Sequence, residues 1–243
     1  MPLPVPDRPV DPGTILTRSL ECYVARPLVF APIYAVVQVP LSLAAVALLA
    51  AVPDADFDRS SRVVAVIEVI GSLLLVLPLA AAASAWALGE IEGGRAPTAA
   101  SALAAAIGRS APLIIAALIA GLATGLGLIA FVVPGIVIAI HLAFSAPAVM
   151  LEGLEASDAL RRSASLVRGR FWRTFGTLAL VIVVTALPQF ALTLFVPVDG
   201  LSERGAAIGL TLVGALGAVL VGPIQAISLT LIFRDLRLRA GSP

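Results

Sequence analysis

The chain has 243 residues, of which 60% are hydrophobic and 13% are charged, and its formal net charge is +1. Soluble domains are about 45–50% apolar and about 25% charged, so this composition predicts an integral membrane protein and excludes a separate soluble catalytic domain. A net charge so close to zero also argues against a nucleic-acid partner. One cysteine and one histidine are too few for a Cys/His metal site, and no metal or other cofactor is expected.

The hydropathy pattern divides the chain into three parts. Residues 1–26 are predicted to be a cytoplasmic segment with an amphipathic helix, residues 27–233 a membrane domain, and residues 234–243 a cytoplasmic tail. The membrane domain holds six apolar segments close to the 17–25 residues that cross a hydrocarbon core of about 30 Å. The predicted fold class is therefore an all-α bundle of six transmembrane helices with cytoplasmic interfacial helices. The predicted spans are residues 28–52, 63–87, 113–132, 135–151, 175–196 and 206–233.

Only the sequence VVPG separates the third span from the fourth. Pro134 lacks a backbone donor and Gly135 permits a sharp turn. A single helix through both spans would be about 58 Å long, nearly twice the hydrocarbon core. A tight helical hairpin is therefore predicted.

The arginines predict the orientation of these spans, because cytoplasmic loops accumulate Arg and Lys. If the N-terminus is cytoplasmic, thirteen of the sixteen arginines fall on the inner side and three fall in outer loops. Both termini are therefore predicted to be cytoplasmic. The basic residues are all arginine and alanine is abundant, which indicates a bacterial chain from a GC-rich genome. The predicted location is the bacterial plasma membrane.

Three inner segments precede the first, third and fifth spans and share a plan. They read GTILTRSLECYVARP, PTAASALAAAIGRSAP and SDALRRSASLVRGRF. The second segment shares with the others only the pair Ala102 and Leu103. The pattern predicts a threefold repeat of an interfacial helix plus a two-span hairpin; the alternative is that any inner segment leading into a span tends to be amphipathic and basic. The first and third segments align without a gap, with Leu16, Ser19 and Arg26 matching Leu160, Ser163 and Arg170.

The segment ALRRSASLVRGRFWR, residues 159–173, concentrates five of the arginines. As a helix it has an apolar stripe and a charged face, which predicts a helix lying in the membrane interface, with Trp172 at the depth that aromatic rings favour. Its planar guanidinium groups are suited to bidentate contacts with phosphate, and the alternative is that they only fix topology and anchor the helix. The candidate phosphate or headgroup ligands are Arg161, Arg162, Arg168, Arg170 and Arg173.

Two ionisable residues inside the spans are functional candidates, because such groups are costly in hydrocarbon. They are His141 in the fourth span and Glu68 in the second. The candidate partners of His141 are Glu68 and the pair Glu152 and Glu155. The alternatives are a neutral His141 bonded to a backbone carbonyl, and a Glu68 side chain that extends to the outer surface.

Two stretches carry a resemblance to a known family. VVPGIVIAIHLAFSAPAVMLEGLEASDALRRSASLVRGRFWRTFG and LIFRDLRLR resemble the bacterial glycerophosphoryl diester phosphodiesterase membrane-domain family. That family takes its name from members in which such a membrane region is joined to a soluble phosphodiesterase barrel. These residues hold no such barrel, so the resemblance implies a membrane fold and carries over no catalytic residue. The matching motif positions are Pro134, Gly135, Glu152, Gly153, Ser163, Trp172, Asp235 and Arg237.

Together these features predict a non-catalytic module that interacts with lipid, or acts as a scaffold, at the inner leaflet. The expected partners are anionic lipids and a membrane protein, and no enzyme activity is expected because the sequence offers no nucleophile with a matching base.

Prolines at 78, 188 and 223 interrupt three spans, either as simple kinks or as walls of a transport site. The alternative function is thus a small transporter or flippase for a lipid or a small amphiphilic metabolite. Glycine pairs at 121 and 125 and at 205 and 209 suit close helix packing, including in a homo-oligomer.

Overall fold

The computed structural model describes residues 10–196 and 201–241. All regular elements in this part of the chain are helical, which confirms the predicted all-α class. Six helical stretches are long and apolar enough to cross a membrane, so the chain is a multi-pass membrane protein. These stretches are Pro27–Ala51, Asp54–Glu92, Ser110–Ala130, Val132–Glu152, Phe171–Leu194 and Glu203–Arg239.

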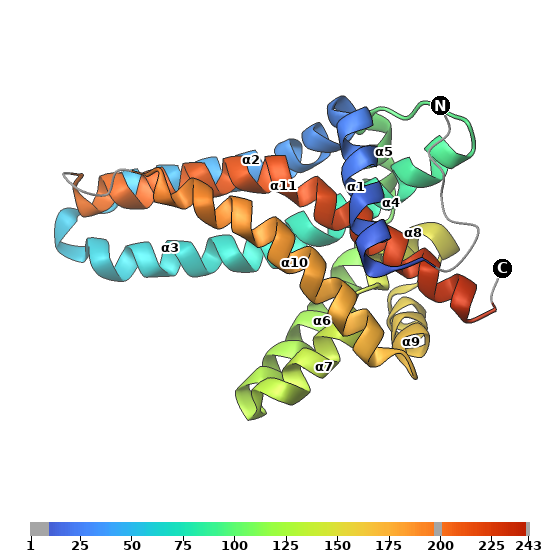
Figure 1. The fold of residues 1–243 in the computed structure, drawn as a ribbon. Helices are drawn as coiled ribbons and strands as arrows, with labels where there is room; N and C mark the ends of the chain where they lie inside the picture. The colour runs from blue at the N-terminus through green and yellow to red at the C-terminus, as the bar shows by residue number, and fades with distance from the viewer. Residues whose placement is uncertain (1–9, 197–200, 242–243) are drawn as a thin grey trace.

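The helices follow one plan three times: a short helix at one end of the molecule, then a two-span hairpin (Figure 1). This order agrees with the predicted layout of the threefold repeat. The first unit is α1 (Pro12–Ala25), α2 (Pro27–Ala51), the short η1 (Asp54–Asp56), α3 (Phe57–Gly71), the π-helical turn η2 (Ser72–Val76) and α4 (Leu77–Glu92). The second is α5 (Ala99–Gly108), α6 (Ser110–Ala130), α7 (Val132–Leu142) and α8 (Ser145–Glu152). The third is α9 (Ala156–Val167), α10 (Phe171–Leu194) and α11 (Glu203–Arg239).

An arginine marks the same point in each unit. Arg26, Arg109 and Arg170 are the N-cap residues of α2, α6 and α10, where a short helix turns into a span. Arg26 and Arg170 are also the pair that aligns in the sequence. The structure shows that Arg109 occupies the equivalent position in the second unit, which the sequence alignment did not match. A long cationic side chain at this position can reach the membrane surface from the end of a span.

The tightly packed part of the molecule lies at the end with α1, α5, α8 and α9, where α4 packs on α5, α8 and α11 (Figure 1). Residues 80–85 of α4 are all buried alanines and serine, and such small side chains let helices approach closely. Phe30, Phe144 and Phe233 are completely buried in the same cluster. Farther along, the hairpins diverge, and the α6–α7 hairpin exposes many large apolar side chains, as a lipid-facing surface does.

Arg204 joins two hairpins at the opposite end. Its guanidinium group donates to the carbonyl oxygens of Leu49 and Val52, both at 2.5 Å, and to the Asp54 carboxylate at 2.6 Å. Carbonyls in the last turn of a helix have no partner within the helix, and a cation there also matches the helix dipole. This arginine, expected only as part of an outer loop, therefore fastens the start of α11 to the end of α2.

The predicted sharp turn at Pro134 and Gly135 is wrong in its position. The chain reverses at Phe131, whose backbone is extended (φ −161°, ψ 143°), and Pro134 lies in the first turn of α7, where a missing N–H costs little. Gly135 serves packing instead. A Cβ at this position would lie 2.6 Å from the backbone nitrogen of Leu128, so α6 and α7 touch backbone to backbone.

Three spans also differ in extent from the prediction. The fourth is broken between α7 and α8 at residues 143–144, and the second is helical from Phe57 to Glu92. The sixth continues to Arg239, so most of the predicted cytoplasmic tail is the end of α11. The predicted cytoplasmic segment and tail include residues 1–9 and 242–243, which lie outside the described residues.

We expect Gly135→Ala to destabilise the protein, because a methyl group there meets fixed backbone of α6. Overpacking of this kind costs about 1–3 kcal/mol, which corresponds to a fall of several degrees in the unfolding midpoint. The buried Cys22 offers the measurement. Burial raises the pKa of its thiol to about 11, so a thiol-reactive fluorophore labels it mainly on unfolding.

The matched control for this substitution is Gly125→Ala on the facing helix. A Cβ at Gly125 has no atom within 4 Å, so its midpoint should equal or exceed that of the wild type. Equal midpoints for the two variants would contradict the close approach of α6 and α7.

Candidate functional site

The arginine-rich segment forms α9, a turn and the start of α10. Gly169 makes the turn with φ +81°, a backbone conformation that favours glycine. The buried side of α9 includes Leu160, Ser163 and Val167, in agreement with the predicted amphipathic helix. This side packs on α6, α7, α8 and α11, so the helix is seated on protein along that face.

The structure separates the five candidate arginines into two groups. Arg161 and Arg168 are exposed, and Arg161 has only a loose surface pair with Asp158 at 3.8 Å, which contributes less than about 1 kcal/mol. Arg162, Arg170 and Arg173 are half-buried and contact groups of the protein. The five side chains therefore do not form a single cluster.

Arg162 and Arg237 share one carboxylate. Glu152, at the end of α8, accepts from Arg162 at 2.9 Å and lies 3.1 Å from Nε of Arg237. The next residue, Gly153, ends α8 in the left-handed conformation with φ +66°. These motif residues thus join α8, α9 and α11 and have a structural role.

Ser163 forms hydrogen bonds with the backbone at the break in the fourth span. Its hydroxyl accepts a hydrogen bond from the Phe144 N–H at 3.0 Å and donates one to the His141 carbonyl at 2.6 Å. Unpaired backbone groups are costly away from water, and the break between α7 and α8 frees such groups. The serine of the Ala-Leu-Arg-Arg-Ser motif therefore supplies partners to a broken transmembrane helix from the neighbouring interfacial helix.

His141 and Glu68 are not brought together. Nδ1 of His141 lies 2.8 Å from the Val137 carbonyl oxygen, and its ring stacks on Phe171 with 5.8 Å between centroids. Among the described contacts of His141 there is no ion pair with Glu68, Glu152 or Glu155, so the backbone-bonded alternative is the one observed. Glu68 instead accepts a hydrogen bond from Ser42 at 2.8 Å.

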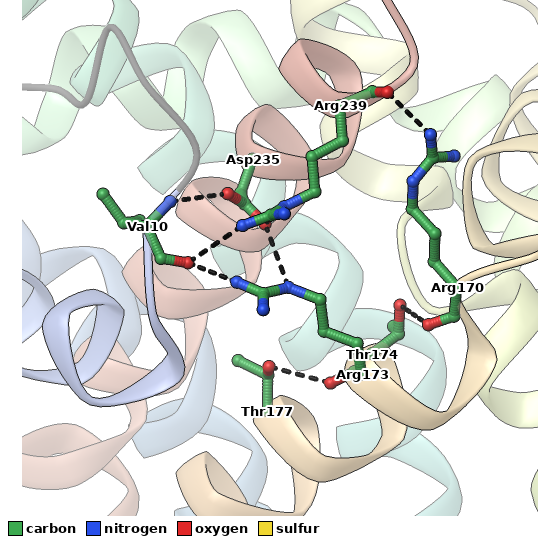
Figure 2. Close-up of polar contacts among 7 residues, drawn as sticks. All are labelled: Val10, Arg170, Arg173, Thr174, Thr177, Asp235 and Arg239. Atoms are coloured by element: carbon green, nitrogen blue, oxygen red, sulfur yellow. Dashed lines mark hydrogen bonds and ion pairs between the residues drawn. The ribbon is translucent and has the colours of Figure 1, made fainter.

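Asp235 lies at the centre of a second polar cluster, at the start of α10 and near the end of α11 (Figure 2). Only 4% of its side chain is exposed. Its carboxylate accepts the Val10 N–H at 3.0 Å and the Nε–H of Arg239 at 2.7 Å, and it lies 3.8 Å from Nε of Arg173. The motif aspartate thus pins the segment before α1 to the ends of two spans.

Backbone carbonyl oxygens hold the same arginines from the other side (Figure 2). The Val10 oxygen accepts from both Arg173 and Arg239, and the Arg239 oxygen accepts from Arg170 at 2.6 Å. A guanidinium group has five N–H donors, so each of the three retains donors beyond these contacts.

Beside this cluster the surface forms an open hollow of about 680 Å³. The side chains of Arg170, Arg173 and Arg239 line it together with Gly169, Phe171 and Trp172. Trp172 is 79% exposed, at the first turn of α10, where it was predicted to meet the membrane interface. Three cations beside one carboxylate, next to the exposed ring of Trp172, form a suitable site for an anion with an apolar tail.

Arg239 was absent from the predicted ligands. Its spacing from Asp235 could have indicated the pair, because residues four apart on a helix share a face. Residues 234–243 were instead expected to form a cytoplasmic tail, so this spacing was not used. The other half of the site, Val10, is brought in only by the tertiary fold.

The fold and this surface define a multi-pass helical membrane protein in which arginine–carboxylate contacts fasten the end of the bundle that holds α1 and α9. The model of a domain family of unknown function, DUF7847, matches residues 96–236, and the chain belongs to this family. No curated protein and no solved structure matches significantly. The matched region runs from just before α5 almost to the end of α11 and includes Glu152, Ser163, Arg173 and Asp235. The resemblance to the glycerophosphoryl diester phosphodiesterase membrane-domain family is not tested by this match and stays a prediction.

We expect Ser163→Ala to lower the free energy of unfolding by about 1–3 kcal/mol, because it leaves the Phe144 N–H and the His141 carbonyl without their partner. Ser165→Ala on the same helix is the control, since that exposed hydroxyl contacts only the Arg162 carbonyl. Thermal unfolding in detergent, followed by labelling of Cys22, compares the two. Equal stability of both variants would show that Ser163 does not support the break.

Proposed function

We propose that the chain is a non-catalytic, lipid-interacting module of the bacterial plasma membrane that holds an anionic phosphate headgroup at the inner leaflet. The observation that carries the proposal is the hollow lined by Arg170, Arg173 and Arg239. Planar guanidinium groups suit phosphate because they can donate two parallel hydrogen bonds to its oxygens.

The arginines of the hollow are held in place before any ligand arrives. Each donates to a backbone carbonyl or to Asp235, so little side-chain freedom remains to be lost on binding. The neighbouring rings of Phe171 and Trp172 offer apolar surface next to the charges. This combination favours a lipid, whose headgroup and acyl chains need both kinds of contact.

The orientation proposed for the protein places this site at the cytoplasmic leaflet. The end of the molecule with α1, α5 and α9 carries most of the arginines, and basic residues favour the cytoplasmic side. The exposed Arg161 and Arg168 add general attraction to an anionic surface, about 1 kcal/mol each. The hollow supplies the site for a particular headgroup.

Substitution of two arginines in the hollow tests this proposal. In native mass spectrometry with phosphatidylglycerol, we expect Arg170→Gln with Arg239→Gln to reduce lipid affinity about tenfold or more, because charge-assisted contacts to phosphate are lost. Phosphatidylcholine, whose headgroup is zwitterionic, should be retained less well by the wild type. Competition with glycerol phosphate separates a headgroup site from a site for a free phosphate.

The matched control is Arg161→Gln with Arg168→Gln, which removes the same charge from the exposed side of the same segment. It should change phosphatidylglycerol affinity by less than about threefold. Equal losses in the two double variants would show general anchoring to the leaflet and would contradict a headgroup site in the hollow.

A second candidate function, a small transporter or flippase for a lipid or a small amphiphilic metabolite, is favoured by a different observation. A polar cavity lies within the apolar part of the bundle and is lined by Glu68 and by glutamines next to or near the span prolines. Interrupted transmembrane helices around a polar site are typical of transporters.

A further inference from the structure

The cavity around Glu68 is distinct from the hollow at the inner surface, and the two share no lining residue. Its volume is about 490 Å³, within the range of about 300–1,000 Å³ that is usual for small-molecule sites. Its walls come from α2, α3, η2, α4, α10 and α11. Polar side chains from these different helices converge on it, including Gln38, Glu68, Ser72, Gln189, Thr211 and Gln225.

Glu68 brings a negative charge to this cavity without a basic neighbour. Within residues 10–196 and 201–241, no ion pair joins Glu68 to an arginine. The Ser42 hydroxyl donates to its carboxylate at 2.8 Å, and Nε2 of Gln38 donates to Ser42 at 2.9 Å. These hydrogen bonds orient the carboxylate without pairing it with a cation, and an unpaired ionisable group is costly within a membrane.

Glu68 lies within the apolar part of the span, five residues after Val63, where the predicted span begins. It is eleven residues from Phe57, the first residue of α3, or about 16 Å along the helix axis. The π-helical turn η2 follows shortly after it, and Ser72 and Val76 of that turn line the cavity. Turns of this type occur mostly as local distortions of α-helices and frequently lie at functional sites.

Small residues of α11 keep the cavity open. Gly214, Ala218 and Gly222 line it on one face of the helix. A Cβ on Gly222 would meet the ring of Tyr34, which therefore packs directly on the backbone of α11. A Cβ on Gly214 would meet nothing within 4 Å, so the space beside it is free.

We propose that this cavity binds a small organic cation of the ammonium class, with its charge on the Glu68 carboxylate. The ring of Tyr34 forms one wall, and aromatic rings attract such cations. A divalent metal ion would need several oxygen ligands, with more than the single carboxylate of this cavity among them. The described residues contain no group of three metal-binding side chains. The amides of Gln38, Gln189 and Gln225 supply the remaining polar contacts.

A pair of probes with the same shape and different charge tests the proposal. Choline carries the ammonium group, and 3,3-dimethylbutan-1-ol replaces its nitrogen with carbon. A ligand that binds only the folded protein raises the unfolding midpoint by an amount that grows with the ratio of its concentration to its Kd, and labelling of Cys22 reports that midpoint. We expect choline, and not the neutral alcohol, to raise the midpoint of the full-length wild-type protein.

Three variants locate the binding. Glu68→Gln should weaken the apparent affinity for choline about tenfold or more, because it removes a charge-assisted contact. Gly214→Leu should abolish the response by filling the free space without meeting a neighbouring atom at Cβ. Asp58→Asn is the control, because it removes the same charge from an exposed pair with Arg62 on the same helix.

The proposal would be overturned by any of three results: no response to choline, an equal response to the neutral alcohol, or wild-type affinity in Glu68→Gln. If Glu68→Gln does not fold, Gly214→Leu decides, and an unchanged response in that variant also overturns it. The outcome is independent of the headgroup site, because none of these substitutions touches the arginines of the hollow.

Discussion

Asp235 has only 4% of its side chain exposed and holds three segments of the chain together near the end of α11. Its carboxylate binds the backbone of Val10 before α1, faces Arg173 at the start of α10, and binds Arg239 one turn farther along α11. Hydrogen bonds with ionised partners are about twice as strong as neutral ones. Two of the three arginines that line the hollow, Arg173 and Arg239, therefore take their positions from a single buried carboxylate, and the proposed headgroup site depends on it.

Several motif residues at this end of the bundle lie where the chain changes direction. Ser163 pairs backbone groups at the break between α7 and α8, and Glu152 joins two arginines just before Gly153 ends α8. Together these contacts link α7, α8, α9 and α11. They form a fixed base from which the three hairpins extend, and the exposed apolar residues of the hairpins suit contact with lipid. Most of the motif positions thus have architectural roles, and the chemistry that remains available lies in the hollow and in the cavity around Glu68.

The all-α class and the number of spans could be predicted from the sequence, because the length of an apolar segment is a local property. The repeated short helices could also be predicted, since Arg26 and Arg170 occupy equivalent cap positions. The partners of the arginines could not be predicted from the sequence. Arg162 and Arg161 are adjacent in sequence, yet one meets Glu152 and the other faces outward, which depends on how α9 packs on the bundle. The cavity was equally hidden, because its polar residues come from different spans and each appears isolated in the sequence.

The central claim, that Asp235 places the arginines for phosphate, is tested most directly by the phosphatidylglycerol affinity of Asp235→Asn. This substitution makes the hollow more positive but removes the group that orients Arg173 and Arg239. Retained folding is checked by slow labelling of Cys22 at room temperature. If orientation controls binding, the affinity falls by about tenfold in spite of the added positive charge. An unchanged or higher affinity would mean that net charge alone attracts the lipid and would contradict the role given to Asp235.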